Sequence, residues 1–275
     1  MTPHLLSSGR RRDASASDRK VQCRWGESHF CRVRSVTADP LVLLPELDRA
    51  TDRLLRTAEA LDDDALKGPS LLPGWTRGHV LTHVARNADS YFNLLTWART
   101  GVRTPGYASA EAREAGIQEG AGRPLAEQLE DLRAASARLA EAAAEMPADA
   151  WGAIIERTGG RKAPAATCVW GRLREVEVHH VDLDAGYGPS DWPEAFSQHL
   201  LREVVSDLTA ATGVTPLILR PTELEHDLTI GQVEQDTPVV AGPTFELAAW
   251  LAGRSSGVDL DATPEGPLPT PPAWI

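Results

Sequence analysis

Cysteine is scarce in this sequence. The 275 residues contain only Cys23, Cys31 and Cys168, and none of them forms a Cys-x-x-Cys motif. An odd number of widely spaced cysteines argues against a disulfide framework and against a zinc site built from thiolates. Such sparse use of cysteine fits a reducing compartment, so we expect a cytoplasmic protein.

Long apolar runs are also missing. No stretch of about 18 apolar residues occurs, so a transmembrane helix is not expected. Residues 10–12 are three arginines, as at the start of some export signals, but residues 13–20 that follow contain no apolar core. A signal peptide needs an apolar segment at this place, so we expect none.

Positive charge is in deficit, since the formal net charge is −11. Proteins that bind nucleic acid carry a basic surface, so we expect no nucleic-acid partner. Residues 1–37 differ from the rest because they are rich in Arg and Ser, carry net positive charge and lack an apolar period. We predict that they form a disordered basic tail, or an upstream extension from a misplaced start codon.

Apolar residues recur at helical spacing in four segments after residue 38. The predicted helices cover residues 40–61, 76–99, 124–146 and 169–184. The connection at residues 101–123 is long enough to be a crossover or a lid, with a short helix expected near residues 110–119. Four helices with a long central connection are typical of a bundle that holds a metal ion between facing helices.

The pattern changes from about residue 190 onward. We predict a helix at 193–211, strands at 215–220, 227–230 and 238–241, a helix at 243–252 and an extended Pro-rich tail at 264–275. The predicted fold class is therefore α+β, with a helical bundle over residues 38–189 and a small α+β domain over residues 190–275.

Residues suited to metal chemistry lie in the last bundle helix. Glu175 and His179 are four positions apart, so a helix places their side chains on one face, where both can bind one metal ion. Asp182, three positions further on, can orient the His179 ring. Taken alone the pair is a weak signal, because many helices carry Glu and His at this spacing as a solvated hydrogen bond.

A second histidine-bearing stretch, residues 72–89, lies far upstream. His79 and His83 are four positions apart on one face of the second predicted helix. One of them, with Glu175 and His179, would give two imidazoles and one carboxylate. Three protein ligands leave one position open, as in catalytic zinc sites. The spacing does not choose between His79 and His83.

Three segments together resemble the mycothiol-dependent maleylpyruvate isomerases, which belong to the wider group of DinB-like metal-binding four-helix proteins. The segments are PGWTRGHVLTHVARNA at 73–88, REVEVHHVDL at 174–183 and GPTFELAAWLAGR at 242–254. The resemblance implies a DinB-like four-helix bundle that holds zinc through His83, Glu175 and His179. It also implies that Arg254, from the C-terminal domain, acts in catalysis. A cation at the end of a helix is the alternative explanation of this arginine.

The resemblance further implies an isomerase of gentisate degradation that converts maleylpyruvate to fumarylpyruvate with mycothiol as its thiol cofactor. A zinc-bound thiol is held as the thiolate, which can add to an electron-poor double bond. The bond, now single, rotates, and the thiolate then leaves. The expected partners are a small dicarboxylate substrate and a low-molecular-weight thiol, without nucleic acid or membrane.

Two other functions remain open at this point. The same ligands would serve a mycothiol S-transferase that conjugates electrophiles, although Arg254 favours a dicarboxylate substrate. The third possibility is a helical metal-binding module that senses thiols or zinc without catalysis. The open ligand position argues against it.

Six residues near these motifs carry more specific expectations. Cys168 is expected to be a small packed residue rather than a nucleophile, and Glu177 to be solvated. His180 lies about 100° around the helix from His179, so a structural or hydrogen-bonding role is expected. Asn87 suits either helix packing or contact with a ligand. Trp75 and Trp97 are expected to line a pocket.

Overall fold

The computed structural model describes residues 39–271 and 274, apart from the side chain of Thr158. The predicted basic tail, residues 1–37, lies outside this part of the chain.

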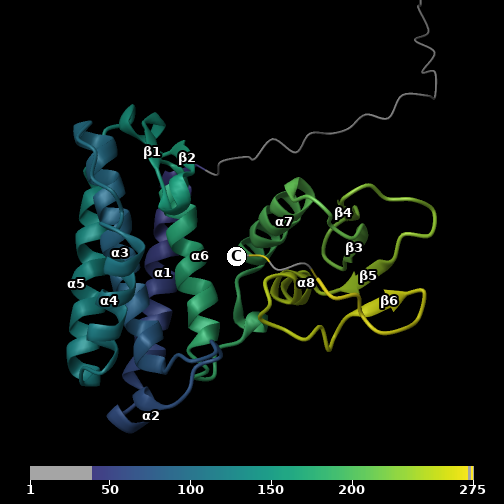
Figure 1. Ribbon diagram of the computed structural model, residues 1–275, viewed down its shortest axis with the longest axis horizontal. Coiled ribbons are helices and arrows are strands. Elements are labelled where there is room, and N and C mark those ends of the chain that lie inside the picture. Colours follow the sequence, from purple (N-terminus) through teal and green to yellow (C-terminus); the bar gives the residue numbers. More distant parts are fainter. Residues whose placement is uncertain (1–38, 272–273, 275) are drawn as a thin grey trace, which may run out of the picture. The chain divides into compact units, whose positions relative to one another are not determined.

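The first part of the described chain is a bundle of long helices (Figure 1). Its helices are α1 (Pro40–Glu59), α2 (Asp63–Lys67), α3 (Arg77–Thr100), α4 (Ala110–Ala121), α5 (Leu125–Ala144) and α6 (Thr167–Asp182). Helix α3 is central, because it packs against α4, α5 and α6, while α1 packs mainly against α6. Leu54, Leu81, Leu95, Leu132 and Leu173 are fully buried in its core.

The four predicted long helices are confirmed, and local chemistry explains where α3 begins and ends. Thr76 caps its first turn by accepting a hydrogen bond from the His79 backbone N–H at 3.4 Å. Gly101 ends the helix in the left-handed conformation, with φ of 73°. The short helix expected in the long connection is α4. Helix α2 was not predicted, because a five-residue helix is too short to show an apolar period.

A small hairpin between α5 and α6 was also not predicted. Its strands are β1 (Ile154–Glu156) and β2 (Lys162–Pro164), which pair antiparallel. Three-residue strands are too short to show alternation, and only the turn is visible in the sequence. There Gly159 and Gly160 have φ of 82° and 79°. Three short 3-10 turns lie at Ala150–Gly152, Thr158–Gly160 and Pro189–Asp191.

The C-terminal part combines two helices with a four-stranded sheet (Figure 1). Its elements are α7 (Glu194–Ala210), β3 (Leu217–Pro221), β4 (Leu228–Ile230), β5 (Val239–Gly242), α8 (Thr244–Leu251) and β6 (Asp261–Thr263). The strand order is β4-β3-β5-β6, and only the β3–β5 pair is parallel. The predicted α+β class is confirmed, while the domain boundary near residue 190 stays a prediction. None of the described helices combines the length and apolarity needed to span a membrane.

The prediction that Glu177 is solvated is wrong. Its carboxylate is completely buried, with Arg53 of α1 donating to one oxygen and the Tyr187 hydroxyl donating to the other at 2.6 Å. Burial raises the pKa of Glu177, although both partners favour the ionised form. The expected hydrogen-bonding role of the neighbouring His180 is confirmed, since its Nε2 lies 2.7 Å from Thr57 Oγ1.

Replacing Arg53 with methionine is expected to lower the free energy of unfolding by about 3 kcal/mol, because the buried Glu177 carboxylate would lose its cation. Urea denaturation at pH 7 measures the change. Arg49→Met is the matched control on the same helix, where an exposed arginine pairs with Glu46 alone and a loss below about 1 kcal/mol is expected. An equal loss of unfolding free energy in the two variants would show that the buried Glu177 carboxylate does not depend on Arg53 for stability.

Candidate metal centre

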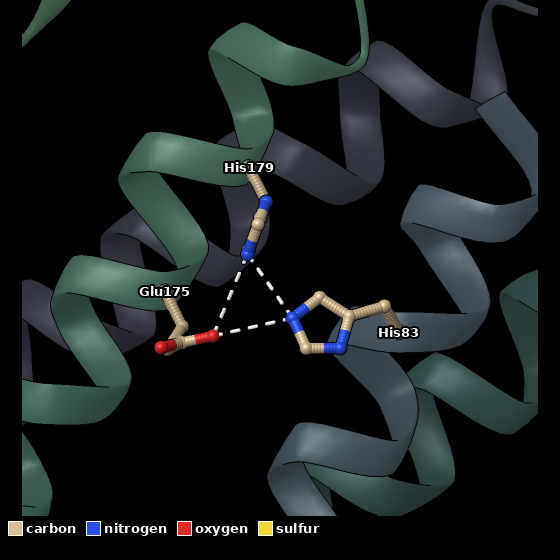
Figure 2. A group of neighbouring side chains, drawn as sticks. All are labelled: His83, Glu175 and His179. Carbon is tan, nitrogen blue, oxygen red and sulfur yellow. Dashed lines mark hydrogen bonds and ion pairs between the residues drawn. The ribbon is translucent and has the colours of Figure 1, made fainter. Parts of the chain in front are cut away.

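Three side chains from two helices converge on one point (Figure 2). His83 projects from α3, and Glu175 and His179 project from α6. His83 Nε2 lies 3.0 Å from His179 Nε2 and 3.3 Å from Glu175 Oε2, and the third distance, His179 Nε2 to Glu175 Oε2, is 3.5 Å. The structure thus brings together the three residues that the resemblance implies as ligands.

These distances fit a divalent metal ion. Zinc bonds to nitrogen and oxygen are about 2.0–2.1 Å long, so two donors in a tetrahedral site lie about 3.3 Å apart. The three measured distances bracket this value. Within the described residues no further His, Cys, Asp or Glu joins this group. Nitrogen and carboxylate donors suit zinc, and also nickel or iron. The role of the three residues as ligands stays a prediction.

The structure distinguishes the two histidines that spacing left equivalent. His83 is 4% exposed and faces α6. His79 is half-buried and lies outside the group, with its Nδ1 2.8 Å from Thr76 Oγ1 and its Nε2 3.2 Å from Gln118 Oε1. His79 therefore stays outside the group of three donors and is hydrogen-bonded to its neighbours through both ring nitrogens.

Asp182 supports the His179 ring from behind. Its Oδ2 lies 2.8 Å from His179 Nδ1, which leaves Nε2 directed at the other two donors. Arg254 donates to the same carboxylate, from Nε to Oδ1 at 3.2 Å and from Nη2 to Oδ2 at 3.1 Å. Burial disfavours ionisation of Asp182, but these hydrogen bonds outweigh it and lower its pKa. The predicted orienting role of Asp182 matches this geometry.

Burial and hydrogen bonding shift the pKa values of the three donors in different directions. Burial lowers the pKa of His83 to about 4, so its imidazole is neutral at physiological pH. Burial also opposes charge on His179, yet hydrogen bonds to Asp182 and Glu175 raise its pKa above the usual 6.5. Despite burial, hydrogen bonds from both histidines hold the pKa of Glu175 well below 4.5.

Zinc binding is expected to release about one proton, from His179, near pH 6. Proton and metal compete for Nε2, so zinc affinity should fall about tenfold per unit as pH drops below the raised pKa of His179. His83, with a pKa of about 4, adds no proton above pH 5. Calorimetric titration in two buffers of different ionisation enthalpy measures the release. A zinc affinity that is flat between pH 5.5 and 7 would contradict the assignment.

Cys168 is not equipped to act as a nucleophile. It is a free, buried cysteine, and burial raises the pKa of its thiol to about 12. The thiolate is the reactive form, so this residue is inert at neutral pH, as expected for a packed side chain.

A cavity of about 660 Å³ opens over the three donors. Aromatic side chains form part of its wall: Trp75, as expected, together with Tyr91, Tyr107 and Trp274. Trp97, for which the same role was expected, does not line this cavity. Asn87 also lines it, while its Oδ1 accepts a hydrogen bond from Arg172 at 2.8 Å, so packing and ligand contact are compatible. A larger cavity, about 830 Å³, lies among α1, α5 and α6 but contains none of the three donors.

Five arginines line the cavity over the donors: Arg113, Arg157, Arg161, Arg174 and Arg254. Only Arg254 was predicted, and its guanidinium is engaged by Asp182, so its catalytic role stays a prediction. The others come from α4, the hairpin and α6. Residues from such separate segments share no spacing that a sequence could reveal.

The fold and the site define a helical-bundle protein with a two-His, one-carboxylate centre beneath an arginine-lined cavity. Residues 47–184 match the family described as "Mycothiol maleylpyruvate isomerase N-terminal domain". A crystal structure of the mycothiol-dependent maleylpyruvate isomerase is 31% identical in sequence, with a TM-score of 0.80, over 86% of this chain and 97% of that one. A histidine-to-alanine mutant of that isomerase matches over the same shares with a TM-score of 0.79 and 31% identity. The comparison with curated proteins found no match.

This chain belongs to the mycothiol-dependent maleylpyruvate isomerase family. The family resemblance and the isomerase class predicted from the sequence are confirmed.

Proposed function

We propose that this protein catalyses the cis–trans isomerisation of maleylpyruvate to fumarylpyruvate with mycothiol and a zinc ion. The observation that carries the proposal is the convergence of His83, Glu175 and His179 beneath a cavity with an excess of arginine. Such a cavity suits a substrate with two carboxylates. The dicarboxylate substrate, the zinc ion and a cytoplasmic location are all parts of this proposal.

The three donors would hold the metal as two neutral imidazoles and one carboxylate, so one positive charge remains. A bound zinc ion would keep a coordinating thiol in its thiolate form at neutral pH. His83 enters this set neutral because burial lowers its pKa to about 4. Asp182 fixes the orientation of His179 through Nδ1.

The reaction requires thiolate addition to the double bond, rotation about the resulting single bond and departure of the thiolate. Negative charge develops on the substrate oxygen conjugated to that bond. Arg254, a cation of the cavity wall held by Asp182, would stabilise this charge. Trp75, whose ring centre lies 5.6 Å from that of His83, covers one side of the site.

The test is turnover of maleylpyruvate by zinc-loaded protein with and without mycothiol, followed by absorbance and by identification of the product. Fumarylpyruvate that appears only when both mycothiol and zinc are present is the expected result. Unchanged maleylpyruvate in their presence would refute the proposal. If a haloarene or an epoxide is conjugated to mycothiol instead, the protein is an S-transferase built on the same ligands.

A further inference from the structure

The arginines of the cavity differ in how their charge is balanced. Arg174 donates to Glu203 at 2.9 Å, and Arg254 binds Asp182. Arg157 and Arg161 form no ion pair with any carboxylate of the described chain, while both line the cavity. Their positive charge is therefore available to a ligand.

Arg157 and Arg161 face each other at the turn of the β1–β2 hairpin. The Arg157 backbone N–H donates to the Arg161 carbonyl at 2.8 Å, which continues the ladder beyond the Glu156–Lys162 pair. Two like charges directly opposite on a hairpin destabilise it unless an anion lies between them. Glu156 does not supply that anion, because it pairs with Arg103 at 3.2 Å.

The position of Arg157 is fixed relative to the metal centre. Its Nη2 donates to the Tyr91 hydroxyl at 2.9 Å, above Gly171 of α6. A Cβ at Gly171 would lie 2.4 Å from the Tyr91 hydroxyl oxygen and 2.8 Å from Arg157 Nη2, so only glycine leaves room for this pair. Gly171 precedes Glu175 by four residues, so the two positions share one face of α6, about 6 Å apart along its axis.

We propose that Arg157 and Arg161 form a carboxylate clamp that binds the substrate carboxylate remote from the metal centre and selects for dicarboxylates. The identity of the substrate rests on the proposed function. The hydrogen bond to Tyr91 occupies one donor of the Arg157 guanidinium and leaves the others for a bidentate contact. Arg161, which is exposed at the cavity rim, supplies the second cation.

The test compares Arg157→Gln, Arg161→Gln and the double variant in zinc-loaded protein, with two readouts. The first readout is the change in KM and the change in kcat for maleylpyruvate, each determined separately. The second is the Kd of succinate by calorimetry, because succinate has two carboxylates but no double bond and needs no turnover. Each single change is expected to raise KM and Kd about tenfold or more, as for loss of a charged hydrogen bond, with kcat changed less than about threefold.

Arg103→Gln is the matched control, since Arg103 contacts the same hairpin but does not line the cavity. It is expected to change KM and Kd less than about twofold. Gly171→Ala should raise KM like Arg157→Gln without removing a charge, because its Cβ displaces the guanidinium. Because Arg161 is exposed, Arg161→Gln should not change the stability of the fold. It therefore still tests the clamp if the Arg157 variants unfold at a lower temperature.

The two proposals fail in different ways. Wild-type values of KM and of the succinate Kd in the double variant would overturn the clamp and leave the isomerase standing. Arginine-dependent succinate binding by a protein that does not isomerise maleylpyruvate would support the clamp and reject the proposed reaction.

Discussion

Replacing His83 with glutamine is expected to abolish both zinc binding and isomerase turnover, whereas the same change at His79 leaves both nearly intact. His83 supplies one of three converging donors, and without it only Glu175 and His179 remain. Mutation of a residue that only supports a metal ligand typically lowers metal affinity or activity about 10–100-fold. Loss of a ligand itself should therefore lower kcat/KM by at least about 100-fold. Elemental analysis and thiol-dependent turnover measure the two effects.

His79→Gln is the matched control because it lies one turn earlier on the same helix. It removes contacts with Thr76 and Gln118, so a stability loss of about 1 kcal/mol is expected without loss of zinc. The reverse outcome, with zinc lost from His79→Gln and kept in His83→Gln, would show that the wrong histidine has been assigned.

Asp182→Asn should have the second largest effect. The buried carboxylate serves His179 and Arg254 together, so its neutralisation leaves Arg254 without its anion and replaces the charged acceptor of His179 with a weaker amide. We expect zinc affinity at pH 8 to fall about 10–100-fold and the free energy of unfolding to fall by about 3 kcal/mol. Calorimetry and urea denaturation measure these changes.

The pH dependence of this variant separates orientation from charge. Asp182 helps to raise the pKa of His179, so in Asp182→Asn that pKa drops and the fall in zinc affinity begins at a lower pH. Asp184→Asn is the control, because Asp184 is exposed, pairs only with Arg77 and has φ of 52°, which asparagine tolerates. A control that loses as much zinc affinity as Asp182→Asn would refute the supporting role.

Much of the bundle could be predicted from the sequence because its helices are long and their ends carry strong signals. Thr76 and Gly101 bound α3 where expected. Glu175 and His179 were identified because four residues span one helical turn. The choice of His83 over His79 came from the family resemblance, since spacing gave both the same face.

The errors share a physical cause. Helical spacing shows which side of α6 carries Glu177. It does not show that α1 packs against that side and brings Arg53 to the carboxylate. The hairpin strands are too short to show a period, so the cavity face of Arg157 and Arg161 was not visible. Such features depend on tertiary contacts between segments that carry no common pattern.

The contact between Arg254 and Asp182 joins segments 72 positions apart in the chain. The His179 ring, a proposed metal ligand, is therefore braced through Asp182 by a guanidinium that follows α8, and the bundle alone lacks that brace. Thermodynamic reciprocity then applies: if attachment of the C-terminal part favours metal uptake, metal uptake tightens that attachment by the same factor. If the proposed metal site is correct, metal starvation would thus loosen the junction between the two parts of the protein as well as stop its proposed reaction.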